Sequence, residues 1–257
     1  MKTILILSLM LIAGLTNYSK AQNPREISER ASSAIELESF EMTATLQIFD
    51  NRGNVRERQI AVATKKFGDV YKTIIEFLAP ADVRGTAMLI YDYDQKDDDM
   101  WIYMPSMRRT RRIVSSEKGR SFMGSEFSNA DMSKPNIDDF TYELLESESI
   151  DGNSCWKIES KPKTDDIANE NGFSKQILYV EKDTYLTQKV EYYDLYEDLN
   201  KIMTISDYRK LNNGSFFAYK MQMENVQNGR KSVYSVNQFQ TGSEIEESGF
   251  STSALEQ

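Results

Sequence analysis

Hydrophobic and polar residues alternate along most of the chain, which is the pattern of β-strands with one buried face. The first run covers residues 40–48, and a turn cluster around Gly53 separates it from a second run near 60–62, so these two predict a hairpin. Turn dipeptides such as Asp151-Gly152 separate the later runs. Those runs lie at about 71–77, 86–93, 99–104, 140–147, 155–160, 175–181, 187–196, 201–209, 217–223 and 232–240. We expect about eleven strands, joined mostly by hairpins, in one large antiparallel sheet.

One helical pattern precedes the strands. Asn23 suits an N-cap and Pro24 the first helical position, and Ile27 and Ala31 recur on one face, which predicts a helix at about 24–38. Helical patterns are too few to cover so large a sheet, so the sheet should curve into a barrel-like shape. The fold class is therefore mainly β.

Two segments lack the strand pattern. Lys2 precedes a short apolar run at 4–15, and Ala21 is a small residue suited to the position before a cleavage site, so residues 1–21 predict a secretory signal peptide and a mature start at Gln22. Residues 115–136 contain two glycines and little alternation, and a loop of that length is often functional.

Composition excludes several function classes. The chain carries 31 basic and 40 acidic residues, and removal of two lysines with the signal peptide leaves 29 minus 40, a charge of -11, which disfavours nucleic-acid binding. It has no histidine and only one cysteine, Cys155, which excludes Ser-His-Asp chemistry, histidine metal sites and internal disulfides. We predict no catalytic residue, no metal and no cofactor, and hence no enzyme.

The densest local signal lies at 100–113. Trp101 and Tyr103 share one face of a strand, and Met100, Ile102 and Met104 share the other. Both faces are apolar, so this strand needs cover on both sides.

Four arginines follow within five positions. Arg108, Arg109, Arg111 and Arg112 come after Pro105, which should end the regular pairing of the preceding strand. Guanidinium groups pair with phosphates or carboxylates, so the cluster predicts contact with an anion or a partner. Pairing with the protein's own acids is an equally weighted alternative.

Methionines recur in the strand runs, where thioethers either line an adaptable apolar pocket or fill a core. These residues are Met42, Met88, Met104, Met203, Met221 and Met223. The sequence indicates an exported binding or carrier domain with an apolar interior.

A family resemblance covers about residues 77–131. This segment resembles the LolA-related family of outer-membrane lipoprotein-sorting proteins. The residues that carry the resemblance are Phe77, Pro80, Asp82, Arg84, Gly85, Thr86, Ala87, Leu89, Trp101, Tyr103, Pro105, Arg108, Arg109, Arg111, Arg112, Ile113, Ser121, Phe122, Met123, Gly124, Ser125, Glu126, Phe127 and Asp131. It implies a single domain over 22–257: a strongly curved, incompletely closed antiparallel barrel with helices and loops across its opening.

The resemblance also implies a periplasmic, monomeric carrier of lipoprotein or other lipid acyl chains, with transient membrane contact and a transporter or outer-membrane acceptor as partner. An accessory protein of an RND-type lipid exporter or a lipid sensor acting on a membrane regulator is the alternative, and a lipid-modifying enzyme is least favoured. Our candidate ligand-binding residues are Trp101, Tyr103, Met104, Phe122 and Met123.

Overall fold

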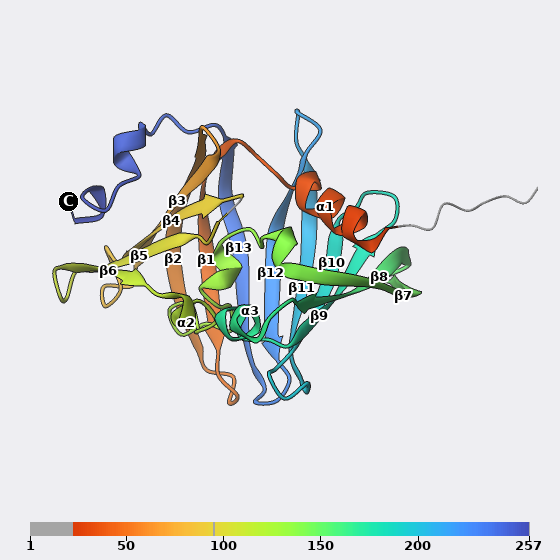
Figure 1. Ribbon diagram of the computed structural model, residues 1–257. Coiled ribbons are helices and arrows are strands. Elements are labelled where there is room, and N and C mark those ends of the chain that lie inside the picture. Colours follow the sequence, from red (N-terminus) through yellow and green to blue (C-terminus); the bar gives the residue numbers. More distant parts are fainter. Residues whose placement is uncertain (1–22, 95, 257) are drawn as a thin grey trace, which may run out of the picture.

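The fold is built on one antiparallel sheet of thirteen strands. A computed structural model describes residues 23–94 and 96–256, so the predicted signal peptide and its cleavage site lie outside the described residues. The strand order is β6-β5-β4-β3-β2-β1-β13-β12-β11-β10-β9-β8-β7. Strands adjacent in sequence therefore pair, except β6 and β7, which are the two edges of the sheet. The pairing of β1 with β13 joins the two halves of the sheet (Figure 1).

The strands are β1 (Ser39–Phe49), β2 (Val55–Phe67), β3 (Val70–Ala79), β4 (Ala87–Tyr93), β5 (Asp99–Met104), β6 (Arg109–Ile113), β7 (Phe140–Ile150), β8 (Asn153–Pro162), β9 (Lys175–Glu181), β10 (Thr187–Tyr193), β11 (Leu199–Lys210), β12 (Phe216–Asn225) and β13 (Arg230–Thr241). The α-helices are α1 (Pro24–Ala34), α2 (Ser115–Lys118) and α3 (Asp165–Asn171), and the short 3₁₀ helices are η1 (Ala130–Met132), η2 (Ile137–Asp139), η3 (Glu247–Gly249) and η4 (Ala254–Glu256). The expected strand number was too low. Strand β6 shows why: an arginine-rich segment without alternation pairs with β5.

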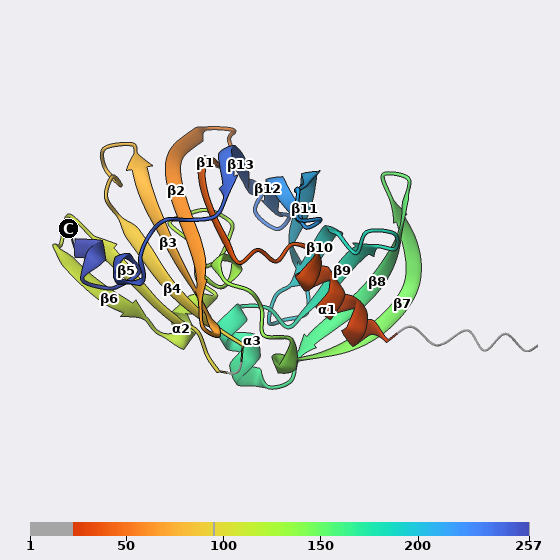
Figure 2. The same ribbon diagram turned by 90° about the horizontal axis from the view of Figure 1, so that it is seen from above.

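The sheet bends into an incomplete barrel, as predicted. In Figure 2, seen from above, it forms an arc whose two ends are β6 and β7, and α1, α2 and α3 lie on its open side. The predicted cover of helices and loops is thus present on the concave face.

Helix α1 begins as the sequence predicts and ends earlier. The Asn23 side chain accepts a hydrogen bond from the Arg25 amide at 3.0 Å, and the helix ends at Ala34. Ile27 and Ala31 are buried against Trp156 of β8, so this helix covers the β8–β9 side of the opening.

Strand β5 is covered on both faces. Met100 and Ile102 belong to the main core on the concave face. Trp101 lies on the convex face, where Phe250 and Leu255 of the C-terminal segment, residues 242–256, are buried. This arrangement confirms that a strand with two apolar faces is enclosed from both sides.

The two ends of the sheet carry opposite charges. Edge strand β6 contains three arginines, and edge strand β7 contains Glu143, Glu146 and Glu148, all exposed. Each edge is therefore a line of like charges beside unpaired backbone groups.

Candidate functional site

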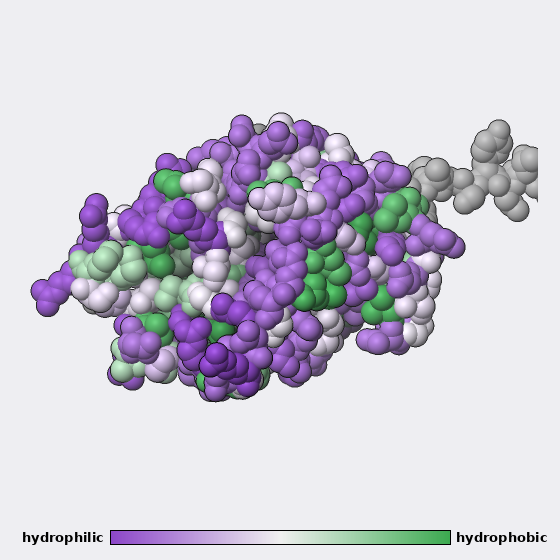
Figure 3. Space-filling view, turned by 90° about the horizontal axis from the view of Figure 1, so that it is seen from below, coloured by the Kyte–Doolittle hydropathy of each residue, from purple (hydrophilic) through white to green (hydrophobic). Residues whose placement is uncertain are grey.

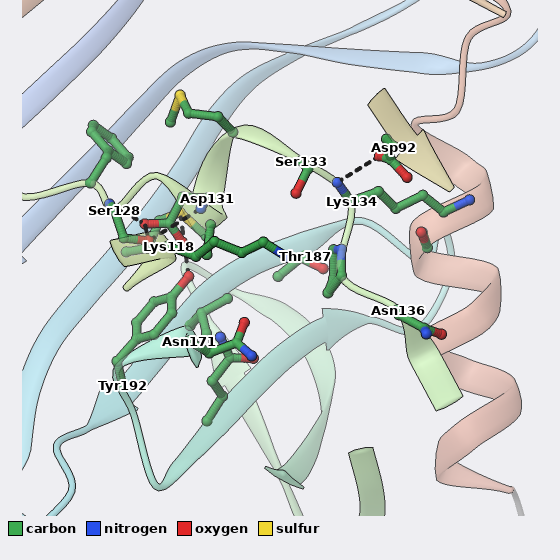
Figure 4. A pocket seen from close by; sticks show the side chains of 18 of the residues that line it. Asp92, Lys118, Ser128, Asp131, Ser133, Lys134, Asn136, Asn171, Thr187 and Tyr192 are labelled. Atoms are coloured by element: carbon green, nitrogen blue, oxygen red, sulfur yellow. Dashed lines mark hydrogen bonds between the residues drawn. The ribbon is translucent and has the colours of Figure 1, made fainter. Parts of the chain in front are cut away.

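The concave face of the sheet encloses a cavity of about 850 Å³. Its wall comes from strands on both halves of the sheet, and its cover comes from α1, α3 and the segment between β6 and β7 (Figure 4). The long loop that the sequence singled out, 115–136, thus contributes directly to the cavity.

Alternation along the strands makes the cavity floor apolar. Met42 of β1, Val62 of β2 and Ile75 of β3 point inward from one half, and Met203 of β11 and Met221 of β12 from the other. Met223 lines the cavity as well, whereas Met88 and Met104 pack elsewhere in the main core. Both interpretations of the strand methionines, pocket lining and core filling, are therefore correct for different members.

Glu126 fastens the loop over one end of the floor. Its carboxylate lies 2.9 Å from Nε of Arg230 and accepts a hydrogen bond from the Asn225 amide at 3.3 Å. Its backbone amide donates to Ser232 Oγ at 2.9 Å, and Lys201 Nζ donates to its carbonyl at 2.6 Å. Glu126 is itself buried, so four partners on β11, β12 and β13 hold one residue of the cover.

A half-buried carboxylate, Asp131, lies on the polar side of the cavity. The side chain of Asp131 accepts hydrogen bonds from the amide and hydroxyl of Ser128 at 2.7 and 2.8 Å. Figure 4 shows it beside Tyr192, whose hydroxyl also hydrogen-bonds to it. Burial raises the pKa of the Asp131 carboxyl and of the Tyr192 hydroxyl.

Further acidic groups line the same side. Burial, with help from the neighbouring Asp98, raises the pKa of Asp92 to about 6. The Lys134 amide donates to the Asp92 carboxylate at 3.0 Å. Lys118 is buried and forms an ion pair with Glu170 of α3. The cavity thus has an apolar floor and a polar side, which suits an amphipathic molecule.

The candidate ligand-binding residues do not line this cavity. Trp101 and Tyr103 lie on the convex face under the C-terminal segment. Met104, Phe122 and Met123 pack in or against the main core beside the cavity. Their role in binding stays a prediction. The floor residues on β11 and β12 were signalled in the sequence only by alternation and by their methionines.

Within the described residues, two of the four clustered arginines pair with the protein's own acids, and the other two do not. Arg111 pairs with Glu117 at 2.6 Å, and Arg112 pairs with Asp99, as the structural alternative expects. Arg108 and Arg109 are exposed and have no ionic partner among the described residues. These two guanidinium groups are the ones free to meet an external anion.

One face of the molecule is mostly polar. Seen from below, it shows separate hydrophobic areas within a largely hydrophilic face (Figure 3). Within residues 23–94 and 96–256, no helix is long and apolar enough to cross a membrane. The same residues contain no cluster of three or more acidic or cysteine side chains suited to hold a metal ion.

Known proteins resemble this chain in sequence and in fold. A family model described only as that of an uncharacterized protein matches residues 69–257. No curated protein matches at a significant level. A DUF1329 family protein from Desulfovibrio piger is 30% identical, with 91% of this chain and 100% of that chain covered at a TM-score of 0.83.

Two further solved structures carry more informative descriptions. A domain from Vibrio parahaemolyticus, described as an outer membrane lipoprotein-sorting protein, is 27% identical over 91% of this chain and 98% of that one, with a TM-score of 0.84. A LolA superfamily protein from Nitrosomonas europaea shares the fold at 21% identity, over 91% of this chain and all of that one, with a TM-score of 0.71. The match along the chain and the shared half-barrel agree with the sequence resemblance: this protein belongs to the DUF1329 family and has the LolA-like half-barrel fold.

Proposed function

We propose that this protein is a periplasmic carrier that binds the acyl chains of lipoproteins or other lipids and passes them toward the outer membrane. The observation that carries the proposal is the 850 Å³ cavity, whose floor is apolar and whose cover is held over the concave face by loops and helices. The descriptions of the related structures as lipoprotein-sorting and LolA superfamily proteins support the same class of cargo.

The physical chemistry of the cavity suits acyl chains. Transfer of each CH₂ group out of water contributes about 0.8 kcal/mol, so a long chain contributes roughly ten kcal/mol before ordering costs. Methionine side chains adapt their shape to different chains, which suits a carrier better than a rigid pocket does. Binding of this kind needs no catalytic group, and the proposal assigns none.

Purification from the native envelope followed by native mass spectrometry tests the proposal. We expect a copurified lipid or lipidated peptide, and we expect the lipid-free protein to bind a fluorescent fatty acid. A preparation that contains no lipid and binds no probe would refute the proposal. A membrane regulator captured in place of a lipid would favour the sensor alternative.

A matched pair of variants on β12 locates the binding site. Met221 faces the cavity, whereas Gln222 is the next residue along the strand and points to the opposite face. A carboxylate placed on this apolar floor would lose its hydration beside a bound acyl chain, so Met221→Asp should weaken probe binding by about tenfold or more. Gln222→Asp introduces the same charge outside the cavity and should stay within about twofold of wild type.

A further inference from the structure

Two arginines at the start of β2 face the concave side of the sheet. Arg56 pairs across the strands with Ile48 and Arg58 with Leu46, two residues whose side chains are buried in the main core. Both arginines thus lie on the same side as Val62, which lines the cavity further along β2. They lie at the end of the sheet next to the β1–β2 hairpin, away from the cavity.

Neither guanidinium group has an acidic partner. Among the described residues no carboxylate lies within ion-pair distance of Arg56 or Arg58. Nη1 of Arg58 is buried and has no hydrogen-bond acceptor. A buried donor without an acceptor is unfavourable by itself, and buried polar atoms in folded proteins nearly always have a partner.

The charges around Arg56 and Arg58 also favour an anion at this place. Burial and the neighbouring charge of Arg56 lower the pKa of Arg58, and among the described residues Asp82 acts in the opposite direction with a smaller effect. Two adjacent positive charges therefore share one weak counter-charge. An anion placed between them would relieve their repulsion and would satisfy the free donors.

A third arginine, Arg230 of β13, lies at the same end and contacts the cover loop. Its Nη2 donates to the carbonyl of Gly124 at 3.1 Å, and its Nε forms an ion pair with the Glu126 carboxylate at 2.9 Å without a hydrogen bond. Nη2 of Arg56 also lies near Gly124, 4.0 Å from where a Cβ atom on that glycine would be. Arg230 is thus occupied by the protein itself, and the donors of Arg56 and Arg58 are the ones left for a ligand.

We propose that Arg56 and Arg58 form a binding site for a phosphate group, separate from the acyl-chain cavity. The planar guanidinium fork matches the geometry of phosphate oxygens, and two forks from alternate positions of one strand reach the same side. The phosphate comes either from a lipid headgroup at a membrane surface or from free phosphate in solution. The site goes beyond the carrier proposal, because it requires no cargo in the cavity.

The test compares two phosphate sources with a set of charge variants of the full mature chain. Binding is measured to phosphatidylglycerol vesicles, with phosphatidylcholine vesicles for comparison, and to inorganic phosphate by calorimetry. Arg56→Gln combined with Arg58→Gln should weaken binding by about tenfold or more, because both forks are lost. Arg58→Lys keeps the charge and loses the fork, so its loss should be intermediate.

Two controls exclude trivial explanations. Arg209→Gln removes one positive charge from β11, where that arginine pairs with Asp207 at 2.9 Å, and should change binding by less than about twofold. Asp82→Asn removes the acidic group that acts on Arg58 within residues 23–94 and 96–256, and it should strengthen binding by about two- to fivefold. Arg56 is exposed, so Arg56→Gln alone keeps the fold and still tests the site if the double variant is unstable.

The outcomes are distinct. Vesicle binding that depends on the two arginines identifies a lipid phosphate, and calorimetric binding without vesicle binding identifies free phosphate. Unchanged binding of both probes in folded Arg56→Gln and double variants overturns the proposal. Fatty-acid probe binding by the same variants should equal that of wild type, so failure of this site and failure of the carrier function are separable.

Discussion

Glu126 offers a direct test of how the cavity cover is held. Glu126→Ala removes the carboxylate that faces Arg230 and accepts from Asn225, while the backbone bonds of residue 126 to Ser232 and Lys201 stay available. The next residue, Phe127, is buried and lines the cavity. The substitution should therefore act on stability and on ligand retention together.

The expected loss of stability follows from the burial of the partners. Breaking a fully buried ion pair costs about 3–5 kcal/mol because one charge is left unpaired. The Arg230 side chain is 38% exposed, so water can solvate part of its charge, and we expect about 3 kcal/mol. For a protein of this size that corresponds to a fall in melting temperature of about 6–12 °C.

Thermal unfolding and stopped-flow release of a fluorescent fatty acid measure the two effects. Glu148→Ala is the control, because that carboxylate pairs with Lys157 at 3.0 Å on the surface and should cost less than about 1 kcal/mol. We expect faster probe release from Glu126→Ala than from Glu148→Ala. A loss below about 1 kcal/mol with unchanged probe release would show that Glu126 does not hold the cover.

Four further predictions rest on other parts of the molecule. Trp101→Ala should lower the free energy of unfolding by about 2–3 kcal/mol, because the indole packs under the C-terminal segment. Fatty-acid affinity per folded molecule should be unchanged, and an altered affinity would show that Trp101 contributes to ligand binding. The double variant Arg108→Glu and Arg109→Glu should keep its melting temperature within a few degrees of wild type. It should bind anionic liposomes or the cognate partner more weakly, in a salt-dependent way. A large loss of stability with intact association would contradict this prediction. Asp92 has a pKa of about 6 in the folded protein against 3.8 ordinarily, so its contribution to stability is lost as pH rises through 6. Asp92→Asn should therefore stabilise the protein by about 3 kcal/mol at pH 8 and have little effect near pH 4 in denaturant titrations. N-terminal sequencing of the exported form should find Gln22 first, and Met1 on a membrane-bound form would refute the signal peptide.

Strand alternation predicted most of the fold because each strand buries one face. Residues 40–48, for example, alternate strictly, and they form β1 with Leu46 and Ile48 buried on the concave side. Strand β6 was not predicted from the sequence, because an edge strand can be polar on both faces and then shows no alternation. The predicted helix was too long because Ile35 continues the apolar pattern, although it is 47% exposed beyond the helix end.

The cavity was harder to predict than the sheet. Trp101 and Tyr103 were apolar and clustered, but the sequence does not reveal which face of a strand is concave. The C-terminal segment showed only a weak pattern, and yet Phe250 and Leu255 cover these residues. The sequence also did not predict the acidic partners of Arg111 and Arg112. Glu117 reaches Arg111 because of the position of α2, and Asp99 reaches Arg112 because of the register between β5 and β6.

The two free edges of the sheet also affect how copies of the protein meet in solution. An open barrel leaves a row of unpaired backbone groups on β6 and another on β7, and such rows can template fibrous assembly. Arg109 on β6, and Glu143 and Glu146 on β7, have no ion-pair partner among the described residues, so like charges make symmetric edge-to-edge pairing unfavourable. The opposite charges favour head-to-tail pairing between β6 and β7, which high salt would weaken, so the association of this protein at high concentration should depend on these few side chains.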